Sequence, residues 1–209
     1  MNKKLRNILT LSLALLSTVS FAQDWNLESR TRANMNGDNS MMLVEQRATL
    51  SSTVGGDNWG VHLSTDVNYM HHGGEASLSV YEAYANADLF GFANLTVGRQ
   101  AWDFGSGAIL GSNQWAADRT TRDGMLIGVN NDFVDLDLGY SSLNFGGDGE
   151  ESTSYTVLNA SKSMGDFSAN LLVVGQTSEA GDDVASGLDV GYSAMGGKLD
   201  LTLGVNAWQ

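Results

Sequence analysis

The chain has 209 residues, a formal net charge of −13, and neither cysteine nor proline. Without cysteine it can form no disulfide framework, no thiolate metal site and no lipoprotein anchor. The excess of acidic residues excludes nonspecific binding to nucleic acid, so no nucleic-acid partner is expected.

The first 22 residues have the pattern of a secretory signal. They combine a basic start with an apolar run at 8–16 and a small-x-small cleavage site at 20–22. Because that run is too short to cross a bilayer, we expect the segment to direct export and then to be removed. Leaving out its basic residues Lys3, Lys4 and Arg6 takes the 11 basic residues to 8, against 24 acidic ones, a net charge of −16.

The rest of the chain, 23–209, alternates between apolar and polar residues over long segments. At 25–35, Trp25 and Leu27 alternate with Glu28, Arg30 and other polar residues, and similar alternation recurs at 59–69 and 198–207. This period of two predicts strands with one apolar and one polar face. We expect eleven strands, at 24–35, 41–54, 59–70, 78–88, 95–103, 124–130, 133–142, 153–164, 167–177, 184–194 and 198–208.

The expected strands are longer than those of most soluble sheets. Many run to about ten or eleven residues, the length that a tilted strand needs to cross a membrane. Aromatic residues stand near strand ends, where a membrane barrel has its interfacial girdle and a soluble protein would have core packing. They are Trp25, Trp59, Tyr69, Phe133, Tyr140, Phe167, Tyr192 and Trp208.

The connections between strands alternate in length. Short links are expected at 55–58, 89–94, 130–132, 165–166 and 195–197, and longer polar stretches at 36–40, 71–77, 104–123, 143–152 and 178–183. Short periplasmic turns alternating with longer outer loops are the layout of an outer-membrane barrel.

An odd number of strands is unusual for such a barrel, because bacterial single-chain barrels have an even number. Either the count is wrong by one, or residues 23–209 are part of a larger barrel. We favour the second interpretation. The fold prediction is therefore all-β: an antiparallel transmembrane β-barrel of the outer-membrane type, incomplete here, from a barrel of roughly 16–18 strands.

One stretch carries a family resemblance. It comprises "YEAYANADL" at 81–89, Gly98-Arg99-Gln100, "WDFGSGAILGSNQW" at 102–115 and "RTTRDG" at 119–124. It resembles the alginate-export family of outer-membrane barrels. The resemblance implies a porin-like passage for polysaccharide or another solute, lined by arginines.

All six arginines of the mature chain precede residue 123: Arg30, Arg32, Arg47, Arg99, Arg119 and Arg122. We expect the first three to line one patch of wall, and the last three to gather at the outer mouth. Guanidinium groups stay charged and bind carboxylates through a planar fork. In the alternative interpretation the arginines only neutralise acidic partners inside the barrel, namely Glu28, Glu45, Glu82 and Asp103.

Arg99 does not fit the expected pattern of inward-facing arginines. Simple alternation places it with Leu95 and Val97, facing lipid. An arginine at mid-membrane would cost about 2–4 kcal/mol. We therefore expect either a bulge that turns Arg99 inward or a position at the membrane interface.

The sequence favours a porin-like channel in the outer membrane for passive passage of hydrophilic solutes, anionic or neutral saccharides among them. Its other expected partners are the lipid bilayer and the barrel-assembly machinery. The alternative is a small closed barrel that acts as a structural or adhesive protein without transport.

An enzyme is not expected. His62 shares a strand face with Ser64 and Asp66, but residues two apart on a strand do not by themselves form a nucleophile–base–orienter chain. His71 and His72 lie in a polar stretch without a second ligand cluster. The sequence therefore predicts no catalytic residue, no cofactor and no metal site.

Overall fold

A computed structural model describes residues 22–35, 42–71, 76–116, 118–143, 153–194 and 199–209. The predicted signal segment lies outside the described residues, except for Ala22. No helix long and apolar enough to cross a membrane occurs in these ranges.

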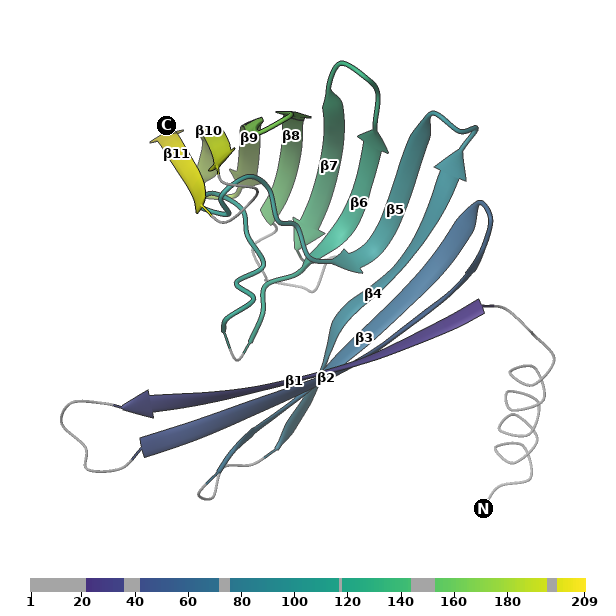
Figure 1. Cartoon of the computed structure of the whole chain (residues 1–209), viewed down its shortest axis with the longest axis vertical. Helices are drawn as coiled ribbons and strands as arrows, with labels where there is room; N and C mark the ends of the chain where they lie inside the picture. Colours follow the sequence, from purple (N-terminus) through teal and green to yellow (C-terminus); the bar gives the residue numbers. More distant parts are fainter. Residues whose placement is uncertain (1–21, 36–41, 72–75, 117, 144–152, 195–198) are drawn as a thin grey trace.

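The described residues form one antiparallel sheet of eleven strands in chain order, each hydrogen-bonded to the next (Figure 1). The all-β class and the expected number of strands are confirmed. The sheet curls but is open, with β1 and β11 at its two edges. The strands are β1 Ala22–Met35, β2 Met42–Gly56, β3 Trp59–Met70, β4 Ser77–Leu89, β5 Ala93–Gln100, β6 Arg122–Val129, β7 Asp135–Leu143, β8 Thr153–Met164, β9 Phe167–Ser178, β10 Gly181–Ala194 and β11 Leu199–Trp208.

Two strand ends differ from the expected ones in a way that matters for the site. Strand β5 ends at Gln100, three residues early, because Trp102 leaves the sheet and is buried on its inner face. Strand β10 begins at Gly181, which pairs with Ser178 of β9. The long connection predicted at 178–183 is therefore wrong, and a tight turn stands there instead.

The two faces of the sheet differ sharply in chemistry. Cross-strand neighbours share a face, and the register places Leu158 beside Val173, and Leu171 beside Leu188, on the outer face. Leu158, Leu171 and Leu188 are exposed to solvent. Among the described strand residues, the charged ones that register places on the outer face are Arg99, Asp123, Lys162 and Asp182, each near a strand end.

A β-bulge in β4 changes what the inner face presents. The register between β3 and β4 shifts between Ser64 and Thr65: Ser64 pairs with Glu82, whereas Thr65 pairs with Val80. The extra residue is Tyr81, which is buried. Because a bulge sets two residues opposite one, the side chains of Tyr81 and Glu82 both lie on the inner face of the sheet.

The connection between β5 and β6, residues 101–121, folds against the inner face; we call it the inward loop. Figure 1 shows it crossing from the end of β5 toward β10 and β11. Its apolar side chains Trp102, Phe104 and Leu110 form a buried cluster with Val157, Leu172 and Val174 of β8 and β9. This cluster gives the inner face a local hydrophobic core.

Candidate functional site

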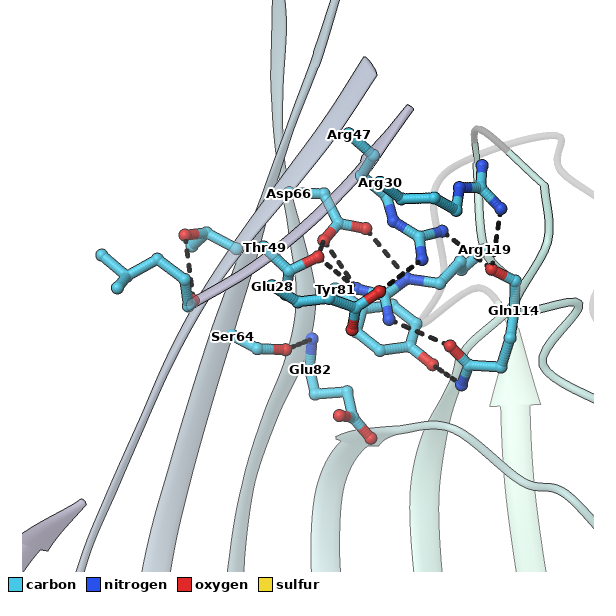
Figure 2. A network of polar contacts seen from close by, with 12 residues as sticks. Glu28, Arg30, Arg47, Thr49, Ser64, Asp66, Tyr81, Glu82, Gln114 and Arg119 are labelled. Carbon is cyan, nitrogen blue, oxygen red and sulfur yellow. Dashed lines mark hydrogen bonds and ion pairs between the residues drawn. The ribbon is translucent and has the colours of Figure 1, made fainter. Parts of the chain in front are cut away.

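Two wall arginines hold the backbone of the inward loop. Arg47 Nη1 donates hydrogen bonds to the carbonyl oxygens of Gln114 and Ala116, at 3.0 and 2.9 Å. Arg30, opposite Arg47 in the register, donates to the same two carbonyls at 3.2 and 3.0 Å. Arg47 is only 3% exposed. The predicted patch of wall arginines exists, but these two side chains are bound to the protein's own backbone (Figure 2).

A third arginine comes from the inward loop itself and reaches the wall. Arg119 donates to both carboxylate oxygens of Asp66, with distances of 3.0 and 2.6 Å, and to Thr49 Oγ1 at 3.2 Å. Thr49 donates to Asp66 in turn. Figure 2 shows the Arg119 guanidinium between Asp66 and Gln114. The Arg119 side chain thus lies against the wall of β2 and β3, and its predicted place at or above an outer mouth stays a prediction.

Tyr81, the extra residue of the β4 bulge, packs against the Arg119 guanidinium. The guanidinium carbon of Arg119 lies 3.2 Å from the centre of the Tyr81 ring, in cation–π geometry. The Gln114 side-chain amide donates to the Tyr81 hydroxyl at 2.8 Å and accepts from Arg119 at 3.1 Å. Wall and loop thus share one connected polar network, which we call the latch: Thr49, Asp66, Tyr81, Gln114 and Arg119.

A second attachment lies on the far side of the inner face. Asp189 of β10 accepts hydrogen bonds from the backbone N–H and the hydroxyl of Ser106, at 2.6 and 3.1 Å. Gly105 before it has a φ of +57° and lies so close to Asp189 that a Cβ there would collide with the carboxylate. The inward loop is therefore fastened to β1–β4 at one end of its path and to β10 at the other.

The acidic partners predicted for the arginines are correct in part. Glu45 pairs with Arg32 at 3.3 Å, and Glu28 with Arg47 at 3.5 Å. Asp103 instead accepts from the backbone N–H and hydroxyl of Ser112, and so braces the loop internally. Glu82 accepts from the Ala101 N–H at 3.0 Å and lies 3.7 Å from His62.

Arg99 stays on the outer face, as simple alternation requires. It pairs in register with Ala83 and with Asp123 without any shift, so the bulge predicted to turn it inward is wrong. Its Nε and Nη2 donate to the two oxygens of Asp123 at 2.8 and 2.7 Å. The cross-strand carboxylate neutralises the guanidinium where the outer face is otherwise apolar.

Arg122 lies next to Asp123, the partner of Arg99, but its side chain points to the opposite face of the sheet. It opens β6 on the inner face, and its guanidinium carbon lies 4.1 Å from the centre of the Tyr155 ring. The side chains of Arg99, Arg119 and Arg122 therefore do not form one cluster: they lie on the outer face, at the wall of β2–β4, and beside β8.

The charges of the inner face are divided along the sheet. Register places Asp135, Asp137, Asp183, Asp189 and Asp200 on the inner face of β7–β11. No lysine or arginine occupies the inner face of the described residues in these five strands. The inner-face arginines of the described strands lie on β1, β2 and β6, among carboxylates such as Glu28, Glu45 and Asp66, whereas the charged side chains that β7–β11 present there are acidic alone.

The residues that sequence reasoning missed are those that hold the loop: Thr49, Asp66, Tyr81, Gln114 and Asp189. Asp66 and Asp189 lie on polar strand faces, which was a visible signal, but their partners are 53 and 83 positions away. Trp208 was expected in an outer girdle. Its parity with Asp200 and Asn206 places it on the inner face instead.

The three residues considered for catalysis are each bound to residues outside this set. His62 Nδ1 lies 2.8 Å from Thr53 Oγ1, and Ser64 accepts from the Glu82 N–H. Asp66 is occupied by Arg119. No family model matches the chain, and no curated protein matches it. The resemblance to alginate-export barrels therefore stays a prediction.

Proposed function

We propose that the chain forms the wall of an outer-membrane channel for hydrophilic solutes, with the inward loop as its constriction. The observation that carries this proposal is the combination of an apolar outer face with a polar inner face that is crossed by a loop fastened at both ends. A transmembrane pore needs an apolar outer face and a polar inner face, and the loop would narrow its lumen.

The outer face supports placement in lipid. Exposed leucines, valines and aromatic residues cover it, including Leu27, Leu203 and Val205 at the two edge strands. A monomeric soluble protein rarely exposes a contiguous apolar surface of this extent. Because backbone groups in lipid must be paired, the proposal requires that the free edges of β1 and β11 find partners in the assembled barrel.

The loop supports a narrowed lumen. Polar contacts to β1–β4 and to β10, with the apolar cluster on β8 and β9, hold residues 101–116 against the inner face. Such a loop reduces the cross-section while leaving polar wall on both sides. The polar and charged side chains of the inner face favour hydrophilic solutes, and we propose saccharides, anionic or neutral, as the class.

The test uses the full-length protein expressed with its leader in a Gram-negative host. We expect recovery in the outer-membrane fraction, heat-modifiable migration on gels, and stepwise conductance in planar bilayers that rises with salt. Recovery as a soluble periplasmic monomer would overturn membrane placement. Heat-modifiable protein that inserts into bilayers without conducting would favour the alternative of a plugged structural barrel.

A further inference from the structure

A cavity of about 490 Å³ opens between the inward loop and the strands beyond it. Its lining comes from Ile109 and Leu110 of the loop, from the start of β6, and from β8–β11. Ligand pockets in proteins have volumes of about 300–1,000 Å³, are mostly apolar, and contain a few placed polar groups. This cavity has the same balance of groups.

Arg122 lines the cavity and differs from every other arginine that the structure describes. Arg32, Arg47, Arg99 and Arg119 each have a carboxylate within 3.5 Å, and Arg30 donates to two backbone carbonyls. Arg122 has neither: within the described residues its guanidinium makes no hydrogen bond or ion pair, and its Nε is buried without a hydrogen-bond partner, as are those of Arg30, Arg32 and Arg47. The guanidinium that lines the cavity therefore lacks a counter-ion among the described residues, and the carboxylate of an anionic ligand would supply one.

The rest of the lining indicates what the anion is attached to. Tyr155 stacks under the guanidinium, and Trp208 presents a second aromatic ring to the cavity. Leu110 and Val174 add buried aliphatic surface, whereas the polar groups besides Arg122 include Gln176 and Asp183. A polyhydroxylated ring would leave many hydroxyl groups against apolar walls. A flat apolar ring would fit those walls.

We propose that this cavity binds a small aromatic monocarboxylate, with its carboxylate on Arg122 and its ring between the aromatic and aliphatic side chains. The inference rests on the proposed channel, because the cavity lies within its lumen, and it adds a binding site for a second solute class beside the saccharides proposed for the passage. Asp183 on the cavity wall disfavours a second negative charge on the ligand. The bidentate guanidinium–carboxylate geometry gives the site its preference for the acid over the amide.

Isothermal titration of the full-length, detergent-extracted protein with benzoate, benzamide and glucuronate tests the proposal. We expect benzoate to bind at least tenfold more tightly than benzamide, because only benzoate carries the charge that Arg122 meets. We also expect benzoate to bind more tightly than glucuronate, which has the same charge on a hydroxylated ring. Equal binding of benzoate and benzamide, or tighter binding of glucuronate, would overturn the proposal.

Two variants assign the effect to the cavity. Arg122→Gln should weaken the binding of benzoate at least tenfold while leaving the binding of benzamide unchanged. Lys162→Gln removes one positive charge from the outer face and should leave benzoate binding unchanged. If Arg122→Gln fails to fold, Arg122→Lys is the second variant. It keeps the charge but loses the planar fork, so the affinity for benzoate should fall toward the affinity for benzamide. Undiminished benzoate binding in a folded Arg122 variant would contradict the site.

Conductance separates this inference from the proposed function. A conducting channel without a preference for benzoate would refute the cavity site and leave the channel intact. A protein that binds benzoate through Arg122 but conducts nothing would refute the channel while keeping the binding site.

Discussion

Arg119 and Asp66 are 53 positions apart in the chain, yet their side chains form an ion pair of 2.6 Å in which they are 4% and 3% exposed. One partner belongs to the inward loop and the other to β3. The pair therefore connects the position of the loop to an intact wall, and its loss should release the loop.

Asp66→Asn tests this pair directly. Removing one partner of a buried ion pair leaves an uncompensated charge and costs about 3–5 kcal/mol. We expect the free energy of unfolding in urea to fall by this amount, and trypsin or elastase to cleave within 101–121 faster than in the native protein. Asp200→Asn, at an exposed carboxylate on β11, is the control. Equal stability of the two variants would show that the latch does not hold the loop.

Strand positions could be predicted because their signal is local. Each strand alternates over ten or so residues, and glycine and asparagine mark the turns, so β3 and β8 have the predicted bounds. The end of β5 could not be read from the sequence, because Trp102 fits an alternating strand. It leaves the sheet because a buried cluster with Val157 and Leu172 exists on the inner face.

The site was predictable only at the level of residue types. The number of arginines and the polar parity of Arg30 and Arg47 indicated a basic wall. Their actual partners, the carbonyls of Gln114 and Ala116, depend on a long loop folding back across the sheet. No periodicity encodes that path. The loop residues that contact the wall are ordinary polar residues in the sequence.

Arg47→Gln should loosen the inward loop without abolishing the wall. The substitution removes the donor that bridges the Gln114 and Ala116 carbonyls, although Arg30 still reaches both. In planar bilayers we expect noisier open-channel current and a changed mean conductance. Arg32→Gln loses the contact with Glu45, a pair that is 38% and 26% exposed. The open-channel current of this variant should stay close to that of the native protein. The opposite order of effects would place the constriction elsewhere.

The outer-face pair Arg99–Asp123 makes a prediction about insertion. Asp123→Asn leaves Arg99 unpaired on an apolar face, where a lone guanidinium is disfavoured in a depth-dependent way. We expect a smaller heat-modifiable fraction after refolding into phospholipid vesicles.

The double substitution of Arg99→Leu with Asp123→Leu removes both charges and should restore folding beyond either single substitution. Such non-additivity is the sign of a direct pair. If both single substitutions refold as well as the native protein, the pair lies in water above the bilayer.

Trp102 and Gly139 should be coupled in stability. Trp102 is 3% exposed in the cluster under the inward loop, and a Cβ added at Gly139 would lie 3.1 Å from its ring and 3.1 Å from Leu126 Cδ1. Trp102→Ala should lower the free energy of unfolding by about 3–5 kcal/mol, because the deleted ring leaves a cavity. Gly139→Ala should cost about 1–3 kcal/mol by overpacking. In the double variant the added methyl group enters the space vacated by the indole, so the combined loss should be smaller than the sum of the two. Urea unfolding of the three variants in detergent measures this coupling, and strictly additive losses would mean that the added methyl group is opposed by Leu126 and not by Trp102.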